Sequence, residues 1–277
     1  MVEARRIGGL ALTHAVLLFG GAIMLLPFVW MLVTSVTPSA EVFDPNFHIL
    51  PRHFAGLANY RDALGQAPLL RFAANGLIVC AGILLGQVVT AVPCAYALAK
   101  LRFPGRSVLF ALVLMSLCIP IQVPALPLYM GLAALGLLNT YFALMFPFLL
   151  SVFAIFLFRQ FFKSFPDEII NAARLDGFSE FEIVWRIVVP SAWPAIAAFA
   201  VFSFVAHWND LYWPLIVITD TNMATPPLGM MFFASAESGT NYGALCAAAT
   251  ISTAPLLIAF LLARKRFVRG ITMSGIK

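Results

Sequence analysis

Residues 164–190 read SFPDEIINAARLDGFSEFEIVWRIVVP, and they form the longest polar interruption of the chain after the loop that follows the first apolar run. Pro166 favours the first turn of a helix, where the N–H that proline lacks would have no partner. Glycine best tolerates the left-handed conformation that ends many helices, so this helix is expected to stop at Gly177. A first short helix is therefore predicted between Pro166 and Gly177.

A second helix is predicted to begin directly after that glycine. Ser179 and Glu182 have the S-x-x-E spacing of a capping box, in which each side chain accepts from the other residue's backbone N–H. Pro190 is expected to end this helix. Residues 164–190, called the corner below, are thus predicted to be two capped helices joined by a tight glycine turn.

The composition identifies an integral membrane protein. The chain has 277 residues, of which 62% are hydrophobic and only 10% charged, and its mean hydropathy is +0.94. A soluble protein of this size would leave much of that apolar surface exposed. The four cysteines lie in apolar runs at unrelated spacings, which predicts neither a disulfide framework nor a metal site.

Six segments are long enough to cross the ~30 Å hydrocarbon layer of a bilayer. The N-terminal apolar run exceeds the roughly 7–15 residues of a signal-peptide core, so it is interpreted as a retained first span. One domain, residues 1–277, is expected: span 10–36 and loop 37–71 lie peripheral to a core at 72–263, and a tail follows at 264–277. The six predicted spans are Leu10–Val36, Phe72–Ala99, Ser107–Met130, Tyr141–Phe158, Ala192–Thr219 and Ala244–Ala263.

The basic residues predict the orientation of these spans. With the N-terminus in the cytoplasm, all but three of the 17 lysines and arginines lie inside, which satisfies the positive-inside rule. Only Arg52, Arg61 and Arg71 remain outside. Both termini and the corner are therefore expected in the cytoplasm, and the net charge of +5 needs no nucleic-acid partner to explain it.

Prolines interrupt several of the predicted spans. Each proline removes a backbone hydrogen bond, which lipid tolerates only where neighbouring helices or a water-filled cavity satisfy the freed carbonyls. Such kinks favour a bundle around a pathway, although membrane helices are in general richer in proline than soluble ones. The prolines are Pro93, Pro120, Pro124, Pro127, Pro214 and Pro255.

The candidate translocation path centres on Asp210, the one acid expected well inside a span. Intramembrane carboxylates are costly and are by default functional candidates. We add Asn209, Pro120 and Gln122 to this path. The alternative is that Asp210 lies near the outer interface within a belt of Trp and Tyr side chains, about 30 Å beyond Pro190 at 1.5 Å per residue.

Motifs for chemistry within the chain are missing. There is no G-x-x-x-x-G-K-[ST] phosphate loop, no H-E-x-x-H, no G-x-S-x-G and no paired carboxylates. Nor is there the ladder of intramembrane acids or histidines that proton-coupled pumps use. No catalytic residue, metal ligand or cofactor is predicted in this chain, and energy for uphill transport would enter through another subunit.

The corner also carries a family resemblance. Asn171-Ala172-Ala173, then Gly177, then Ile187-x-Val189-Pro190 resemble the E-A-A-x3-G-x9-I-x-L-P signature of permease subunits of binding-protein-dependent ABC importers. Other stretches resemble carbohydrate-uptake permeases of the maltose G type and glycerol-3-phosphate permeases of the E type. They are Leu135–Pro147, Phe156–Phe162, Trp208–Val217 and Arg266–Gly270.

Two positions depart from that signature. Asn171 stands where the signature has glutamate, and Val189 replaces leucine. The asparagine removes a charge, so an ion pair of the family's glutamate is not transferred to this chain. Glu168, three residues earlier on the same helical face, is a candidate to compensate.

The resemblance implies a type I ABC importer permease: an all-α integral membrane fold with six kinked spans and a cytoplasmic coupling helix. Implied partners are a second, homologous permease, two ATPase subunits that bind ATP and Mg, and an extracytoplasmic solute-binding protein, all at the bacterial inner membrane. The expected solute is a sugar or polyol, alternatively glycerol-3-phosphate or another polyol phosphate. A secondary transporter or a membrane enzyme is the rival of a different class. The residues expected to dock on the ATPase are Asn171, Ala172, Ala173, Asp176 and Gly177.

Overall fold

The computed structural model describes residues 2–42, 50–236 and 241–273, and these residues form helices and loops without a strand. The chain divides into two compact units, which are described separately. Unit 1 comprises residues 1–69 and 230–253, and unit 2 comprises residues 70–229 and 254–277. The corner and all the predicted path residues belong to unit 2.

Unit 1 begins with the long apolar helix α1, Val2–Ser35. The carbonyls at its C-terminal end need hydrogen-bond donors that the helix itself cannot supply. Asn59 of α2 (Ala58–Gln66) provides them, because its buried Nδ2 donates to the carbonyls of Ser35 at 3.0 Å and Thr37 at 2.8 Å. The 3₁₀ turn η1 (Ser39–Glu41) lies between these helices in sequence.

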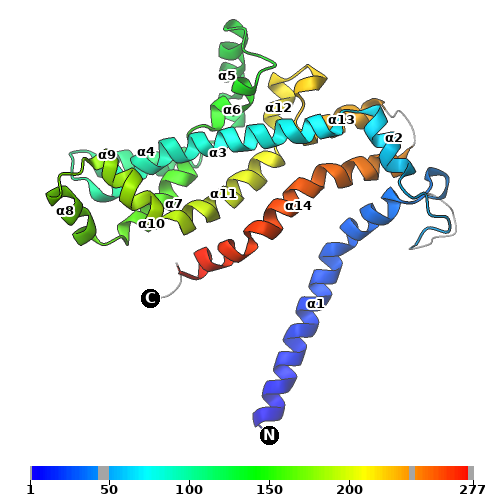
Figure 1. Ribbon diagram of the computed structural model, residues 1–277, viewed down its shortest axis with the longest axis horizontal. Helices are drawn as coiled ribbons and strands as arrows, with labels where there is room; N and C mark the ends of the chain where they lie inside the picture. The colour runs from blue at the N-terminus through cyan, green and yellow to red at the C-terminus, as the bar shows by residue number, and fades with distance from the viewer. Residues whose placement is uncertain (1, 43–49, 237–240, 274–277) are drawn as a thin grey trace. The chain divides into compact units, whose positions relative to one another are not determined.

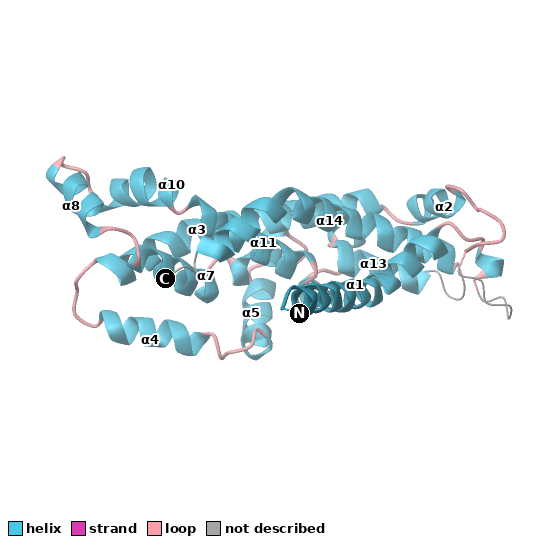
Figure 2. Ribbon diagram, turned by 90° about the horizontal axis from the view of Figure 1, so that it is seen from below, coloured by secondary structure: helices cyan, strands magenta, loops and turns pink. Residues whose placement is uncertain are grey.

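Unit 2 is built along α3 (Leu69–Lys100), the longest helix that it contains. In both ribbon views the corner lies at the C-terminal end of α3 and α5 stands across its direction (Figures 1 and 2), and Figure 1 shows α6 and α12 on the same side of α3 as α5. The remaining elements of the chain are α4 (Arg106–Ser116), α5 (Gln122–Ala134), α6 (Tyr141–Met145), η2 (Phe146–Phe148), α7 (Val152–Lys163), α8 (Asp167–Leu175), α9 (Glu180–Glu182), η3 (Ile183–Val188), α10 (Val189–Ser191), α11 (Trp193–Trp208), α12 (Tyr212–Val217), η4 (Thr221–Met223), α13 (Pro226–Ala236) and α14 (Tyr242–Met273).

The core of unit 2 joins the membrane helices to the corner. Phe158 and Phe162 of α7 are fully buried, and the ring of Phe158 packs edge-on against Phe199 of α11 at 5.3 Å between centroids. The same cluster includes Ile170 from α8 and Ile183 from η3. The corner is therefore anchored by apolar burial to the helices it follows, so that a displacement of one is transmitted to the other.

A close approach of η2 and α3 depends on a glycine. A Cβ at Gly86 would lie 2.6 Å from Cδ2 of Leu149, a distance that real Cβ atoms do not show. Thr90, one turn further along α3, donates its hydroxyl to the carbonyl of Leu149 at 2.9 Å. The small residue thus lets the two segments meet, and the hydroxyl fixes their contact.

Three helices of the described residues are long and apolar enough to span a membrane by themselves. Five spans result if each of two bent pairs is counted once: α6–η2 with α7, bent by 48°, and α9–α10 with α11, bent by 79°. The predicted third span, 107–130, is divided into α4 and α5, and exposed Pro120 lies in the break between them. Proline cannot supply the N–H that a continuous helix needs, which accounts for the break.

The second helix of the corner ends at Ser191, one residue beyond the predicted end at Pro190, and Pro190 itself lies inside the helix. The chain runs from α9 through the π-helical segment η3 into α10, which contains Pro190, and the break comes at Ala192. Because proline leaves the carbonyl of residue i−4 without its usual donor, a wide π turn just upstream accommodates the ring within the helix. Pro93 and Pro255 likewise lie inside continuous helices.

Candidate functional site

The glycine turn of the corner has the full hydrogen-bond pattern of a Schellman motif. Gly177 has a φ of +84°, and its N–H donates to the carbonyl of Arg174 at 3.1 Å. The N–H of Phe178 donates to the carbonyl of Ala173 at 3.0 Å. Both Phe178 and Ala173 pack in the core cluster, which is the apolar contact that usually accompanies this motif. The predicted helix end at Gly177 is confirmed.

The predicted capping box is also confirmed. Ser179 Oγ accepts from the N–H of Glu182 at 3.3 Å, and a carboxylate oxygen of Glu182 accepts from the N–H of Ser179 at 3.1 Å. Pro166 precedes the first residue of α8 with a φ of −60°, followed by Asp167 and Glu168 in the first turn. Acidic side chains at the N-terminus of a helix are stabilising, because they interact with the positive end of the helix dipole.

An ion pair fastens the start of α8 to the end of α3. The side chain of Lys100 is only 7% exposed, and its Nζ donates to Oδ1 of Asp167 and to the carbonyl of Phe165, both at 2.5 Å. The hydrogen bond from this ammonium lowers the pKa of Asp167, so the carboxylate stays ionised at neutral pH. The pair holds α8 at the C-terminal end of the membrane helix α3.

A second polar network ties α8 to α9 across the glycine turn. Arg174 donates from Nε to Glu180 at 2.7 Å and from Nη1 to Oδ1 of Asn171 at 3.1 Å. The other carboxylate oxygen of Glu180 accepts from the hydroxyl of Tyr96 on α3 at 2.6 Å. Thus Glu180 pairs across the glycine turn, and Asn171 joins the same network as a neutral acceptor. Glu182 also forms an ion pair, with Arg186 at 3.4 Å, whereas Glu168 has no ion pair within 4.0 Å in the described chain.

The structure places four of the five predicted docking residues on the outer face of the corner. Asn171, Ala172, Asp176 and Gly177 are exposed. Ala173 is only 5% exposed and faces the core, because it falls on the same side of α8 as buried Ile170, three residues earlier. Its small side chain serves the packing of α8 onto unit 2.

Two apolar side chains on that outer face were missed from the sequence. Leu175, the last residue of α8, is 90% exposed, and Phe181 of α9 is also exposed. Both are large apolar groups close to the glycine turn, and the ring of Phe181 lies 6.1 Å from that of Trp185 between centroids. The available signal was their position: each falls outside the buried helical face that Ile170, Ala173 and Ile183 define. An exposed Leu and Phe on a rigid tip suit burial in a partner surface.

In the candidate path, Asp210 lies between α11 and α12 and caps the latter. Its Oδ1 accepts from the N–H of Tyr212 at 3.0 Å and of Trp213 at 3.5 Å. Asn209 is the residue that ends α11, and its Nδ2 donates to the carbonyl of Val205 at 2.8 Å. The predicted span 192–219 is therefore two helices, and this acid organises the turn between them.

The other two path residues lie elsewhere in unit 2. Pro120 is exposed in the break between α4 and α5, and Gln122 is exposed at the first position of α5. No hydrogen bond joins either of them to Asn209 or Asp210 among the described residues. The path assignment of all four remains a prediction.

A buried polar cluster between α3 and α11 was missed. Ser203 Oγ donates to Oε1 of Gln87 at 2.6 Å, and Nε2 of Gln87 lies 3.2 Å from Nε2 of His207. Gln87 and Ser203 are buried, and the ring of Phe148 lies 4.7 Å from that of His207. A glutamine and a histidine inside predicted spans were the signal, because such groups are retained in lipid only with partners.

The described residues contain no group of three or more His, Cys, Asp or Glu side chains that could hold a metal ion.

Comparison with known proteins agrees with this architecture. Residues 69–273 match the family described as binding-protein-dependent transport system inner membrane component. Curated relatives include the sn-glycerol-3-phosphate transport system permease protein UgpE of Salmonella typhi, 32% identical over 99% of both chains, and that of Pectobacterium atrosepticum, 31% identical over 99% of both.

A solved structure shares the fold. It belongs to a bacterial ABC transporter involved in the import of the acidic polysaccharide alginate, with a TM-score of 0.81 and 24% identity over 95% of this chain and 97% of the other. The fold is thus that of an ABC importer permease, as expected. Since the family match covers the whole of α3 and runs to the end of α14, this chain belongs to the inner membrane components of binding-protein-dependent transport systems.

Proposed function

We propose that this chain is the permease subunit of an ATP-driven importer that moves a sugar or related polyol across the cytoplasmic membrane, and that the corner couples it to the ATPase. The observation that carries this proposal is the outer face of the corner. Leu175 is 90% exposed on a turn that a Schellman motif, a capping box and two ion pairs fix in place. A rigid tip with an apolar side chain is suited to insertion into a cleft of another subunit.

The corner transmits movement because both of its helices are attached to membrane helices. Lys100 connects α8 to α3, and η3 with α10 leads directly into α11. When ATP draws the two ATPase subunits together, the corners of the two permeases approach one another, and the attached helices move as rigid bodies. The pathway then opens outward to receive solute from the binding protein, and hydrolysis resets it. ATP and Mg are bound by the ATPase and not by this chain.

A second candidate for the solute is a polyol phosphate. The relatives named as sn-glycerol-3-phosphate permeases align over nearly their full length at 31–32% identity, which favours this class. The permease partner or this chain would hold the solute, with Asn209, Asp210, Pro120 and Gln122 as the candidate path residues. A transport assay with glycerol-3-phosphate, glycerol and maltose in parallel distinguishes the two classes of solute.

The test is uptake of labelled solute by cells that express the chain together with the partner permease, the ATPase and the solute-binding protein. We expect uptake to require the ATPase, and to fall at least tenfold in Leu175→Ser together with the amount of ATPase that co-purifies. Leu57→Ser, an equally drastic change at an exposed position of unit 1, is the matched control and should leave both unchanged. Uptake that persists without the ATPase and follows an ion gradient would instead indicate a secondary transporter.

A further inference from the structure

The segment between α3 and α4 carries a surplus of positive charge, because Asp167, an acid whose pKa the charge of Arg102 helps to lower, is already paired with Lys100. Arg102 and Arg106 have no carboxylate within 4.0 Å in the ranges that the structure describes. Arg106 donates from Nη1 to the carbonyl of Leu101 at 2.9 Å, which fixes its side chain, whereas the exposed Arg102 makes no such bond. A third guanidinium, that of Arg159, lies 3.6 Å from the centroid of the Phe110 ring on α4.

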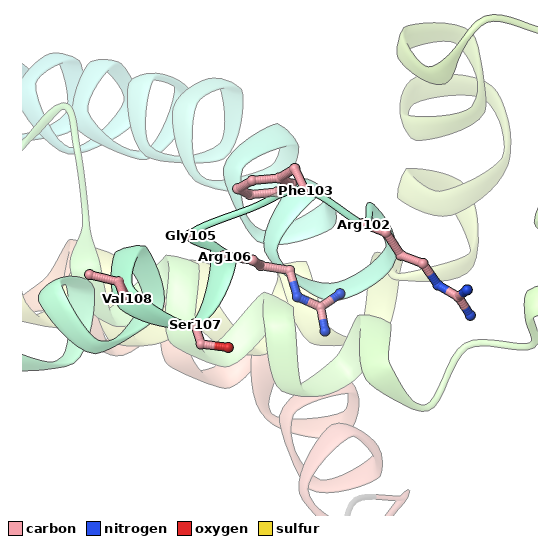
Figure 3. A pocket seen from close by; sticks show the side chains of 6 residues that line it. All are labelled: Arg102, Phe103, Gly105, Arg106, Ser107 and Val108. Atoms are coloured by element: carbon pink, nitrogen blue, oxygen red, sulfur yellow. The ribbon is translucent and has the colours of Figure 1, made fainter.

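A tight turn brings the two arginines to the same cavity. Gly105 has a φ of 80° and a ψ of −2°, the values of the third residue of a type II turn, and Pro104 occupies the second position that proline favours. Both guanidinium groups extend the same way from this turn, and Ser107 lies beside Arg106 (Figure 3). The open cavity has a volume of 480 Å³ and is lined by Arg102, Phe103, Gly105, Arg106, Ser107 and Val108.

The cavity lies at the boundary between membrane and water. The membrane helix α3 ends at Lys100, two residues before Arg102, and the apolar helix α4 begins at Arg106. Along α4, Val108, Leu112 and Met115 are exposed and lie on one face, because they are spaced by four and three residues. A charged cavity therefore continues directly into an exposed apolar stripe.

We propose that this cavity binds the headgroup of an anionic phospholipid. Its phosphate lies between Arg102 and Arg106, since the planar guanidinium matches phosphate oxygens with paired donors. An acyl chain follows the stripe on α4, which a soluble phosphate would leave uncovered. Lys100 and Asp167 place the cavity on the same side of the membrane as the corner, and only the assignment to the cytoplasmic leaflet rests on the proposed function.

The test is a titration of the purified full-length chain in detergent with fluorescent phosphatidylglycerol, phosphatidylcholine and, as competitor, inorganic phosphate. Arg102→Gln/Arg106→Gln should weaken phosphatidylglycerol binding about thirtyfold, and Arg102→Gln alone about fivefold. Lys163→Gln removes one exposed charge at the end of α7 and should leave the affinity unchanged. Arg102→Gln keeps the test valid if the double variant misfolds, because the Arg102 side chain makes no hydrogen bond within the described chain.

Four results would overturn the proposal. The first is that phosphatidylcholine binds as tightly as phosphatidylglycerol, and the second is that Lys163→Gln weakens binding as much as the arginine variants do. The third is that inorganic phosphate competes at the same concentration as the lipid. The fourth is that the double variant keeps its lipid affinity but no longer retains the ATPase. The last result would assign the arginines to a protein interface. The titration uses neither solute nor ATP, so its failure is distinguishable from failure of the proposed transport function.

Discussion

Gly177 is the residue on which the geometry of the corner depends most directly. Its φ of +84° lies where other L-residues are strained, while a Cβ added there would meet no atom within 4 Å. Any effect of substitution on the isolated subunit is therefore an effect of backbone strain. We expect Gly177→Val to lower the unfolding free energy by about 1–2 kcal/mol and Gly177→Asn by much less, because asparagine tolerates the left-handed region.

The measurement for this pair is thermal unfolding of the purified chain, followed by solute-stimulated ATP hydrolysis of the assembled transporter. Val should reduce both, whereas Asn should preserve both. If the two variants lost stability equally, side-chain volume rather than backbone conformation would be the cause.

Tyr96 gives a second test at the scale of one residue. It is buried, and its hydroxyl donates to Glu180 at 2.6 Å. Because the acceptor is a carboxylate, Tyr96→Phe should cost about 1.5–3 kcal/mol of stability. Tyr212→Phe is the matched control, since the hydroxyl of this exposed tyrosine has no hydrogen-bond partner in the described chain. An equal loss in both variants, seen in chemical denaturation, would rule out the proposed link between α3 and the corner.

Local signals predicted the ends of the corner's helices but not the pairing of its charges. Gly177, Ser179 and Glu182 act through bonds to residues within five positions, so sequence spacing sufficed. The pairing of Arg174 with Glu180 crosses the glycine turn, and Tyr96 joins it from α3, 84 residues away. Reasoning from helical spacing alone pointed to Glu168 and could not detect a contact made by the fold.

At the scale of elements, the association of α3 with α11 depends on a polar cluster. Gln87 accepts from Ser203 and contacts His207 in an otherwise apolar interface. Ser203→Ala should therefore cost about 0.6 kcal/mol and at most about 1.7 kcal/mol, the average and the maximum for hydrogen bonds between membrane helices. Ser116→Ala is the control, because the hydroxyl of Ser116 bonds only to the carbonyl of Leu112 in its own helix.

A double-mutant cycle tests whether Gln87 is the partner that matters. Combining Ser203→Ala with Gln87→Leu should cost less than the two single changes together, since the double variant leaves one fewer polar group unsatisfied. Additive losses, measured by unfolding in detergent micelles, would mean that the two side chains do not interact.

The elements themselves were predictable to different degrees. The long helices α1, α3 and α14 follow from length and hydropathy alone, and their internal prolines did not break them. The third, fourth and fifth predicted spans are each divided, at Pro120, at Leu149–Ser151 and at Asn209–Leu211. Whether a proline breaks a membrane helix or is absorbed by it depends on which neighbours satisfy the freed carbonyls, and the sequence does not specify those neighbours.

For the whole molecule, a contact in unit 2 constrains the number of membrane crossings. Lys100 at the end of α3 bonds to Asp167 at the start of α8, so both lie on the same side of the membrane. The chain between them must cross an even number of times. If α6–η2–α7 crosses once, α4 and α5 together must supply the other crossing, although neither is long enough by itself. Helix length and composition alone give at most five spans. The requirement for an even number of crossings between Lys100 and Asp167 adds one, which supports the six predicted spans.

The parity argument predicts that the loop after α5 and the corner lie on opposite sides of the membrane. Leu135 directly follows α5 and Leu175 is the last residue of α8, and both are exposed, which makes them suitable reporters. In a chain whose four native cysteines are replaced by alanine, Leu135→Cys should react with a membrane-impermeant maleimide in intact spheroplasts. Leu175→Cys should react only in inverted vesicles, because the corner is expected in the cytoplasm, and Leu57→Cys should behave like Leu135→Cys. Labelling of positions 135 and 175 from the same side would mean that α4 and α5 re-enter the membrane without crossing it, and the six-span topology would then be wrong.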